Sequence, residues 1–209
     1  MLNNTLSVST LTVLVMDCST SMRRFGQQPR HELNAMLRTL RAEKGALATQ
    51  LVVYGFNKQP FVLCQGSLTQ ILEIGQLPLD AGTRLFGTVA DVLTSTLRFV
   101  QEVRATGQRA NVIVAVITDG EDNLSAHDLP EVRKLAAHAT RAEFHLEVIG
   151  LGVDGKFLAA LMGFSVDHSV NLAATSEGLS QSLQSITGET TRLMRLGEKV
   201  ADPKKQKPS

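Results

Sequence analysis

The stretch Leu11-Thr-Val-Leu-Val-Met-Asp-Cys-Ser-Thr-Ser21 decides the fold. Its first six residues are mostly apolar and β-branched, which is typical of a strand buried on both faces of a parallel sheet. Three oxygen-bearing side chains follow at alternate positions, Asp17, Ser19 and Ser21. Alternate residues of an extended loop point the same way, so these oxygens would form half of a shell for a hard cation. Helix capping and turn formation explain the same residue types, and both interpretations stay open at this point.

Length and composition indicate one domain. The chain has 209 residues, of which 43% are hydrophobic, enough to bury a core without covalent cross-links. We predict a single domain over residues 1–200 and a basic, disordered tail over 201–209. The net charge of +1 argues against nucleic acid as the main partner.

The cysteines and the N-terminal sequence indicate the cellular setting. Cys18 and Cys64 are the only cysteines, too few for a disulfide framework or a cysteine-based zinc site. The first residues carry no basic segment, and the apolar run after them is too short for a signal sequence or a membrane span. We therefore expect a reducing, cytoplasmic setting and no membrane span.

Strand and helix patterns alternate along the chain, which predicts an α/β fold. Residues 66–80 fit either a short helix or an extended segment. The predicted strands cover 11–16, 50–56, 61–65, 111–118, 145–151 and 169–172, and the predicted helices cover 30–48, 86–105, 129–141, 156–162 and 176–200.

These elements predict a doubly wound, mostly parallel sheet of about six strands with helices on both faces. The strands at 11–16 and 111–118 should lie at its centre, because only these two are apolar almost throughout. The turn at 57–60 is too short for a parallel crossover, so 50–56 and 61–65 should form an antiparallel hairpin with 61–65 at the sheet edge.

Oxygen ligands from three segments should meet at one end of this sheet. Asp17 and Asp119 both follow apolar strands, and Thr83 lies in a loop that enters a helix returning to the same sheet. Ligands of doubly wound sheets bind outside the carboxyl ends of the strands. Capping residues alone would rarely gather in this way.

Three motifs then resemble those of the von Willebrand factor A domain over roughly residues 9–195: Asp-x-Ser-x-Ser from Asp17, Gly-Thr at Thr83, and Thr-Asp-Gly around Asp119. In that family the motifs form the metal-ion-dependent adhesion site. The resemblance implies that Asp17, Ser19, Ser21, Thr83 and Asp119 coordinate Mg²⁺, with Mn²⁺ or Ca²⁺ as alternatives. It further implies a non-enzymatic module, without catalytic residues, that binds an Asp or Glu of a protein partner.

Departures from the family pattern refine this expectation. The integrin type carries extra acidic residues directly after the serines, where this chain has Arg23, Arg24, Phe25 and Gly26, so we expect no second adjacent ion. The chain is similar to stand-alone intracellular prokaryotic members, some of them scaffolds linked to tellurite-resistance and phage-defence genes. We therefore expect a role in a stress or defence system.

Arginines surround the proposed metal site. Arg23, Arg24 and Arg84 would lie on loops beside the ion, with Arg30 near them. They form either a solvated basic rim or a surface that steers an acidic partner toward the cation.

A glycine motif also occurs late in the chain. Gly150, Gly152 and Gly155 match G-x-G-x-x-G between a strand and a helix, the pattern of dinucleotide-binding loops. That motif usually follows the first strand of a Rossmann domain, and no acidic strand end lies about twenty residues further on. We therefore do not expect nucleotide binding.

Two rival functions share the predicted metal. A metal-assisted hydrolase would use the ion to activate water, but the three motifs contain no histidine or lysine as a base. Glu121 or Asp122 would serve only if turned inward, and the plainer interpretation is that both are solvated. In an assembly or scaffold component, the metal would simply hold three loops together.

Overall fold

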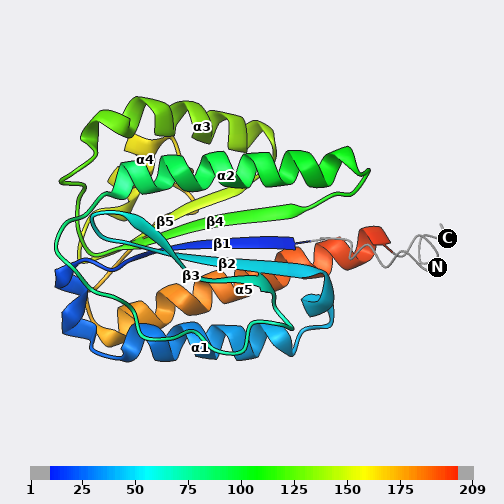
Figure 1. Ribbon diagram of the computed structural model, residues 1–209, viewed down its shortest axis with the longest axis horizontal. Helices are drawn as coiled ribbons and strands as arrows, with labels where there is room; N and C mark the ends of the chain where they lie inside the picture. The colour runs from blue at the N-terminus through cyan, green and yellow to red at the C-terminus, as the bar shows by residue number, and fades with distance from the viewer. Residues whose placement is uncertain (1–9, 202–209) are drawn as a thin grey trace.

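A six-stranded sheet forms the centre of the protein (Figure 1). The computed structural model describes residues 10–201. The strand order is β3-β2-β1-β4-β5-β6; β2 and β3 are antiparallel and the other neighbours are parallel. This confirms the predicted sheet, its two central strands and its antiparallel edge. The strands are β1 (Thr10–Asp17), β2 (Thr49–Phe56), β3 (Pro60–Ser67), β4 (Asn111–Thr118), β5 (His145–Leu151) and β6 (Val170–Leu172).

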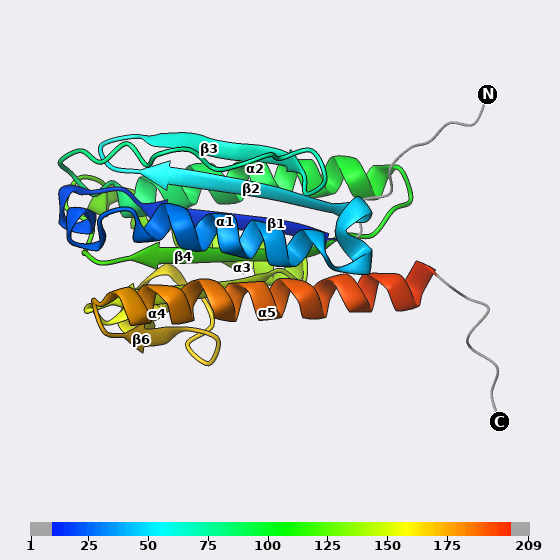
Figure 2. The same ribbon diagram turned by 90° about the horizontal axis from the view of Figure 1, so that it is seen from below.

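Helices cover both faces of the sheet (Figure 2). On one face lie α1 (Gln28–Arg41) and α5 (Ser176–Ala201), and on the other lie α2 (Leu85–Ala105), α3 (Leu129–Arg141) and α4 (Gly155–Met162). Three short 3-10 segments complete the fold, η1 (Thr20–Phe25), η2 (Lys44–Ala48) and η3 (Ala126–Asp128). The doubly wound α/β class is therefore confirmed.

Strand β1 contributes to both cores because alternate side chains of a strand point to opposite faces. Leu14 and Met16 pack with the α1 and α5 layer, whereas Val13 and Val15 pack with the α2, α3 and α4 layer. All eight residues of β1 are buried. An almost unbroken apolar run is what a strand covered on both faces requires.

Two segments differ from the sequence-based expectations. Helix α1 ends at Arg41 instead of 48. The 3-10 segment η2 follows, and Leu47 in it is 66% exposed. Residues 71–79 form neither helix nor strand. They are held in place by Asn34, whose side chain accepts a hydrogen bond from Ile74 N (2.8 Å) and donates one to Ile74 O (2.9 Å).

Helix α5 is continuous through Gly178, Gly188 and Gly197. The predicted tail at 201–209 lies outside the described residues, apart from the backbone of Ala201 at the end of α5. Within the described part of the chain, none of the helices has the length and apolar character needed to cross a membrane.

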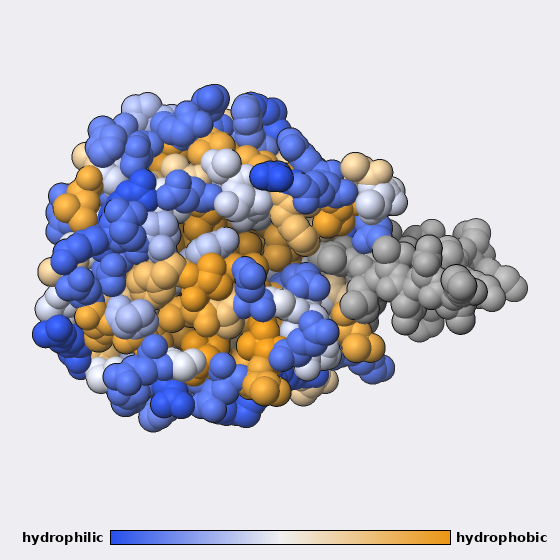
Figure 3. All heavy atoms as spheres, in the orientation of Figure 1, coloured by the Kyte–Doolittle hydropathy of each residue, from blue (hydrophilic) through white to orange (hydrophobic). Residues whose placement is uncertain are grey.

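The register of the sheet brings the ends of β1 and β4 to the same level. Met16 lies opposite Ile117, so Asp17 and Thr118 are the next residues on the two strands. The carboxyl ends of the parallel strands point to the left in Figure 1, where η1 also lies. In Figure 3 this end is mainly hydrophilic, while apolar atoms gather in the middle of the visible face, over β3.

Candidate metal centre

Asp17 ends β1 with its side chain fully buried. Its Oδ1 accepts a hydrogen bond from Ser19 N–H (2.7 Å), and its Oδ2 accepts one from the Thr118 hydroxyl (2.7 Å). Burial raises the pKa of Asp17 above its ordinary value, the hydrogen bonds from Ser19 and Thr118 oppose this rise, and nearby Asp119 adds to it. Charging this carboxylate therefore costs free energy in the folded protein.

The two serines connect Asp17 with the next ligand loop. Ser19 Oγ lies 2.8 Å from Ser21 Oγ, and Ser21 Oγ donates a hydrogen bond to Asp119 Oδ1 (2.6 Å). Ser19 occupies the N-cap position of η1, but its side chain makes no capping hydrogen bond. Helix capping therefore does not account for the Ser19 hydroxyl, although Asp17 Oδ1 does support the local turn.

Asp119 has one oxygen without a hydrogen bond. Its side chain is fully buried, and the described residues offer Asp119 Oδ2 no hydrogen-bond partner. Arg24 Nη2 lies 3.2 Å from this oxygen as an ion pair. A buried carboxylate oxygen is costly unless a charge or donor compensates it, so this position favours a cation.

Thr83 is held against the Asp119 loop. Thr83 N–H donates to Asn123 Oδ1 (2.9 Å), and Asn123 N–H donates to Thr83 O (3.1 Å). A Cβ atom on Gly120 would lie 4.0 Å from Thr83 Oγ1. The Thr83 hydroxyl is therefore beside the residue that follows Asp119, and all five predicted ligand residues lie at one end of the sheet.

Asp122 has a role that the sequence did not reveal. Its Oδ2 accepts a hydrogen bond from Phe86 N–H (2.9 Å), and its Oδ1 accepts one from Ser125 N–H (2.6 Å). The N-cap residue of α2, Arg84, makes no side-chain cap of its own. Asp122 thus caps α2 from another loop and is half-buried, whereas Glu121 is exposed as expected. The spacing of Asp122 and Ser125 predicts a local capping bond between them. The bond from Phe86 to Asp122 has no such signal, because Phe86 is distant in sequence.

The predicted arginine rim divides into three different environments. Arg84 is engaged with Asp91 (2.8 Å) and Asp128 (3.6 Å), and Arg30 pairs with Glu73 as a further surface contact. Arg24 lies on Asp119, as described above. Arg23 is exposed, and none of the described acidic side chains lies within ion-pair distance of it.

The donor set fits a hard divalent cation. Two carboxylates and three hydroxyls supply oxygen ligands, and two negative charges balance the ion. Within residues 10–201 no group of three or more His, Cys, Asp or Glu side chains is placed to hold a metal. A centre in this part of the chain would therefore depend on hydroxyl ligands as well as carboxylates, which favours Mg²⁺ over softer metals.

Comparisons with known proteins find similar structures but no similar sequences. No protein-family model and no curated protein sequence matches the chain. The pilus adhesin SpaC from Lactobacillus rhamnosus GG is similar in structure, with 12% identity and a TM-score of 0.64 over 88% of this chain. The vWF domain of the type V pili tip protein Mfa5 from Porphyromonas gingivalis has 13% identity and a TM-score of 0.60, covering 88% of this chain and 95% of that domain. The chain has the von Willebrand factor A fold.

Other structures with this von Willebrand factor A fold are larger or metal-loaded. This chain spans only 30% of the SpaC chain. Manganese-loaded TRAP from Plasmodium vivax is 15% identical, with a TM-score of 0.52 over 86% of this chain and 72% of that chain. These identities establish the fold alone, so the ligands and partners of this chain are inferred from its own residues.

The glycine motif at 150–155 serves backbone packing. A Cβ on Gly155 would lie 2.5 Å from Gly150 N and 2.8 Å from Val170 O. The N-terminal donors of α4 are already used, because Phe157 N–H donates to Asp154 Oδ1 (3.0 Å) and Lys156 N–H donates to Asn171 Oδ1 (3.1 Å). Close approach of backbones therefore explains the glycines without a nucleotide.

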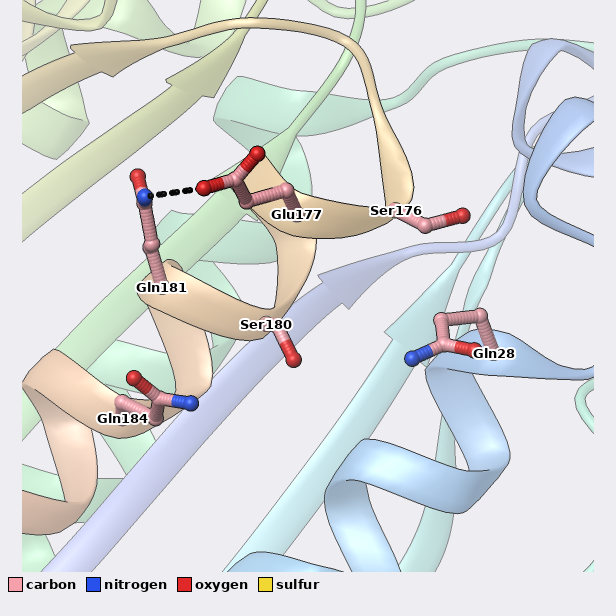
Figure 4. A pocket seen from close by; sticks show the side chains of 6 residues that line it. All are labelled: Gln28, Ser176, Glu177, Ser180, Gln181 and Gln184. Atoms are coloured by element: carbon pink, nitrogen blue, oxygen red, sulfur yellow. Dashed lines mark hydrogen bonds between the residues drawn. The ribbon is translucent and has the colours of Figure 1, made fainter.

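A polar hollow lies between the N-terminal ends of α1 and α5, at the same end of the sheet (Figure 4). It is separate from the five ligand residues and is built from amide, hydroxyl and carboxylate groups. Two of its lining residues donate to Glu32 Oε1 of α1: Gln28 Nε2 (2.5 Å) from the same helix, and Ser180 Oγ (2.6 Å), which joins α5 to α1. The hollow is lined by Gln28, Ser176, Glu177, Ser180, Gln181 and Gln184.

Proposed function

We propose that this protein is a non-enzymatic, metal-dependent module that binds an Asp or Glu side chain of a protein partner. Asp17, Ser19, Ser21, Thr83 and Asp119 would hold a single divalent cation, Mg²⁺ or alternatively Mn²⁺ or Ca²⁺. The observation that carries the proposal is the link between two buried carboxylates on separate loops. Asp17 accepts a hydrogen bond from Ser19 N–H (2.7 Å), Ser19 Oγ lies 2.8 Å from Ser21 Oγ, and Ser21 Oγ donates to Asp119 (2.6 Å). Asp119 Oδ2 adds a buried oxygen that makes no hydrogen bond to the described residues.

Charge explains why a partner carboxylate would bind there. Asp17 and Asp119 balance a divalent ion, while the serine and threonine hydroxyls contribute oxygens without further negative charge. Bound Mg²⁺ supplies a local positive charge and keeps waters that another oxygen ligand can replace. A carboxylate contact in this partly dehydrated setting should be stronger than an exposed salt bridge, which is worth about 0–1 kcal/mol.

The hydrolase alternative lacks a suitable base among the described residues near the cluster. Asp122 is occupied by backbone N–H groups of the α2 and Asp119 loops, and Glu121 is exposed. Within residues 10–201, none of the five ligand residues is hydrogen-bonded to a histidine. These observations favour binding over metal-assisted hydrolysis.

Partner binding would also be coupled to helix α5. The ligand loop leads through η1 directly into α1, and Glu32 on α1 accepts a hydrogen bond from Ser180 on α5. This contact is polar, and Ser180 also lines the polar hollow of Figure 4. It can therefore exchange partners more easily than apolar core contacts can. We propose that movement of the ligand loop shifts α5 through this contact.

The cellular setting belongs to the same proposal. Cys18 is buried and Cys64 half-buried, and both are free thiols, which suits a reducing cytoplasm. We propose that the protein acts in the cytoplasm as a scaffold component of a stress or defence system.

Selection of peptides tests the function. A random-peptide display library would be panned on the immobilised protein in Mg²⁺ and eluted with acid, and each enriched peptide would then be tested for binding in Mg²⁺ and in EDTA. We expect enriched peptides that contain an essential Asp or Glu, whose binding is lost on change to Asn or Gln and on Thr83→Ala in a folded domain. Peptides that bind equally well in EDTA would instead leave the cation a purely structural role, and they would contradict the proposal.

A further inference from the structure

We propose that Arg24 competes with the cation for Asp119 and thereby sets the cation concentration at which the site fills. The inference rests on the proposed function, because it assumes that Asp119 ligates the cation. It goes beyond that function by assigning a regulatory role to a residue outside the ligand set.

The position of Arg24 is well defined by three contacts. Its Nη2 lies 3.2 Å from Asp119 Oδ2, and its Nε donates a hydrogen bond to Ser21 O (3.0 Å). Its guanidinium carbon lies 6.0 Å from the centre of the Phe25 ring, within the range of a cation–π contact. The guanidinium is therefore attached to the backbone of one ligand residue while it contacts the carboxylate of another.

Two cations cannot share Asp119 Oδ2 without repulsion. The Asp119 side chain is fully buried and its Oδ2 makes no hydrogen bond to the described residues, so Arg24 supplies the positive charge that this oxygen requires. A divalent ion on the same oxygen would be brought close to the guanidinium, and like charges at this range repel strongly at low dielectric. Cation binding must therefore displace Arg24.

Moving Arg24 away from Asp119 should cost little free energy, but enough to change the measured affinity for the cation. The Arg24 side chain is 49% exposed, so water screens the ion pair and the guanidinium can move into solvent. An exposed ion pair is weak, and this one should be somewhat stronger because its carboxylate is buried. Removing the competitor should therefore raise the affinity for Mg²⁺ by about 3- to 10-fold.

Arg23 provides a matched control. It carries the same charge in the same 3-10 turn, is exposed, and makes no ion pair with the described residues. Arg23→Ala removes the same long-range repulsion as Arg24→Ala but leaves the contact with Asp119. Arg84 is unsuitable for this purpose because it is paired with Asp91 and Asp128.

Calorimetric titration with Mg²⁺ alone tests the inference on the full chain, after circular dichroism has checked the fold of each variant. We expect Arg24→Ala to bind Mg²⁺ about 3- to 10-fold more tightly than wild type and Arg23→Ala to stay within about 2-fold. Arg24→Lys, which keeps the charge but loses the Nε donor that bonds Ser21 O, should lie between wild type and Arg24→Ala. In EDTA, the melting temperature of Arg24→Ala should be below that of wild type, and Mg²⁺ should reverse this difference.

The outcomes separate this inference from the proposed function. Equal Mg²⁺ affinity in wild type and Arg24→Ala, or an equal gain in Arg23→Ala, would overturn the role of Arg24 while the metal site stands. If neither wild type nor any arginine variant binds Mg²⁺, both proposals are wrong. Binding that is seen in Arg24→Ala but is too weak to measure in wild type would support both.

Discussion

At the scale of single residues, Asp17 is a buried carboxylate whose charged form is unfavourable in the folded protein. Burial raises its pKa above the ordinary value of 3.8. A raised folded-state pKa gives stability at pH values below the ordinary one, and this stability is lost as the pH rises through the folded-state pKa. Without a cation, the protein should therefore carry an electrostatic cost at neutral pH.

Asp17→Asn should remove this cost. In EDTA we expect the variant to melt at a higher temperature than wild type near pH 7, with a difference that shrinks toward pH 4. An amide nitrogen at this position can still donate a hydrogen bond to Thr118 Oγ1, so packing should be kept. Thermal melts of both proteins across this pH range check the expectation. A difference that does not depend on pH would show that the Asp17 charge is not its cause.

Asp122 and Glu121 form a second comparison at this scale. Asp122→Ala removes acceptors for the N–H groups of Phe86, Leu124 and Ser125, and we expect a loss of about 1–3 kcal/mol in unfolding free energy. Because the same bonds hold the Thr83 and Asp119 loops together, Mg²⁺ affinity should fall as well. Glu121→Ala should change neither quantity in denaturant unfolding and calorimetry. Equal effects of the two substitutions would argue against a capping role.

The residues of the candidate site were more predictable than the contacts that support them. Asp17 and Asp119 follow recognisable strands, and parallel strand ends meet at one edge, so their proximity followed from the sequence pattern. Asp122 has no comparable signal, because its partner Phe86 lies in the first turn of α2, distant in sequence. The pairing of Arg24 with Asp119 likewise depends on how η1 folds back over β4, which no local pattern specifies.

At the scale of elements, two helical glycines, Gly155 in α4 and Gly188 in α5, should respond in opposite ways to alanine: one substitution should lower the free energy of unfolding and the other should raise it. Gly155→Ala would bring a Cβ to 2.5 Å from Gly150 N and 2.8 Å from Val170 O, both backbone atoms. We expect a loss of about 1–3 kcal/mol, the usual cost of overpacking. Gly188 lies within α5, and a Cβ there would meet nothing within 4 Å.

Gly188→Ala should therefore stabilise the protein by about 0.5–1 kcal/mol, because alanine loses less conformational entropy in a helix. Urea unfolding of both variants measures the two changes. A neutral result for Gly155→Ala would remove the packing explanation of the glycine motif and return attention to a ligand at that turn.

Element boundaries show where the patterns were insufficient. The spacing of Leu33, Leu37 and Leu40 marks the buried face of α1, and all three are buried. Leu47 continues that spacing, but the chain turns into a 3-10 segment after Arg41 and exposes it. Residues 71–79 are held by Asn34 and by their own buried apolar side chains. Because no regular backbone pairing is involved, their sequence shows neither a helix nor a strand period.

At the scale of the whole molecule, the proposal couples the ligand loop to α5. Hydrogen–deuterium exchange would be measured in Mg²⁺ with and without a selected acidic peptide. We expect faster exchange at the N-terminal turns of α5, around Ser180, when the peptide binds, because the contact with Glu32 is polar and exchangeable. The apolar contacts of Leu183 and Ile186 should keep the central turns protected. Unchanged exchange throughout α5 would limit the module to binding without a helix shift.

The central claim is that three loops form one divalent cation site, and Mn²⁺ titration followed by electron paramagnetic resonance tests it most directly. The resonance signal of free Mn²⁺ falls as ions bind, so the number of bound ions per chain follows by difference. Added Mg²⁺ tests whether the site also accepts that ion. We predict one Mn²⁺ per chain that Mg²⁺ displaces in wild type, and loss of this binding in Asp17→Asn with an unchanged far-ultraviolet circular dichroism spectrum. No bound Mn²⁺ in wild type, or the same stoichiometry and affinity in Asp17→Asn, would contradict the account.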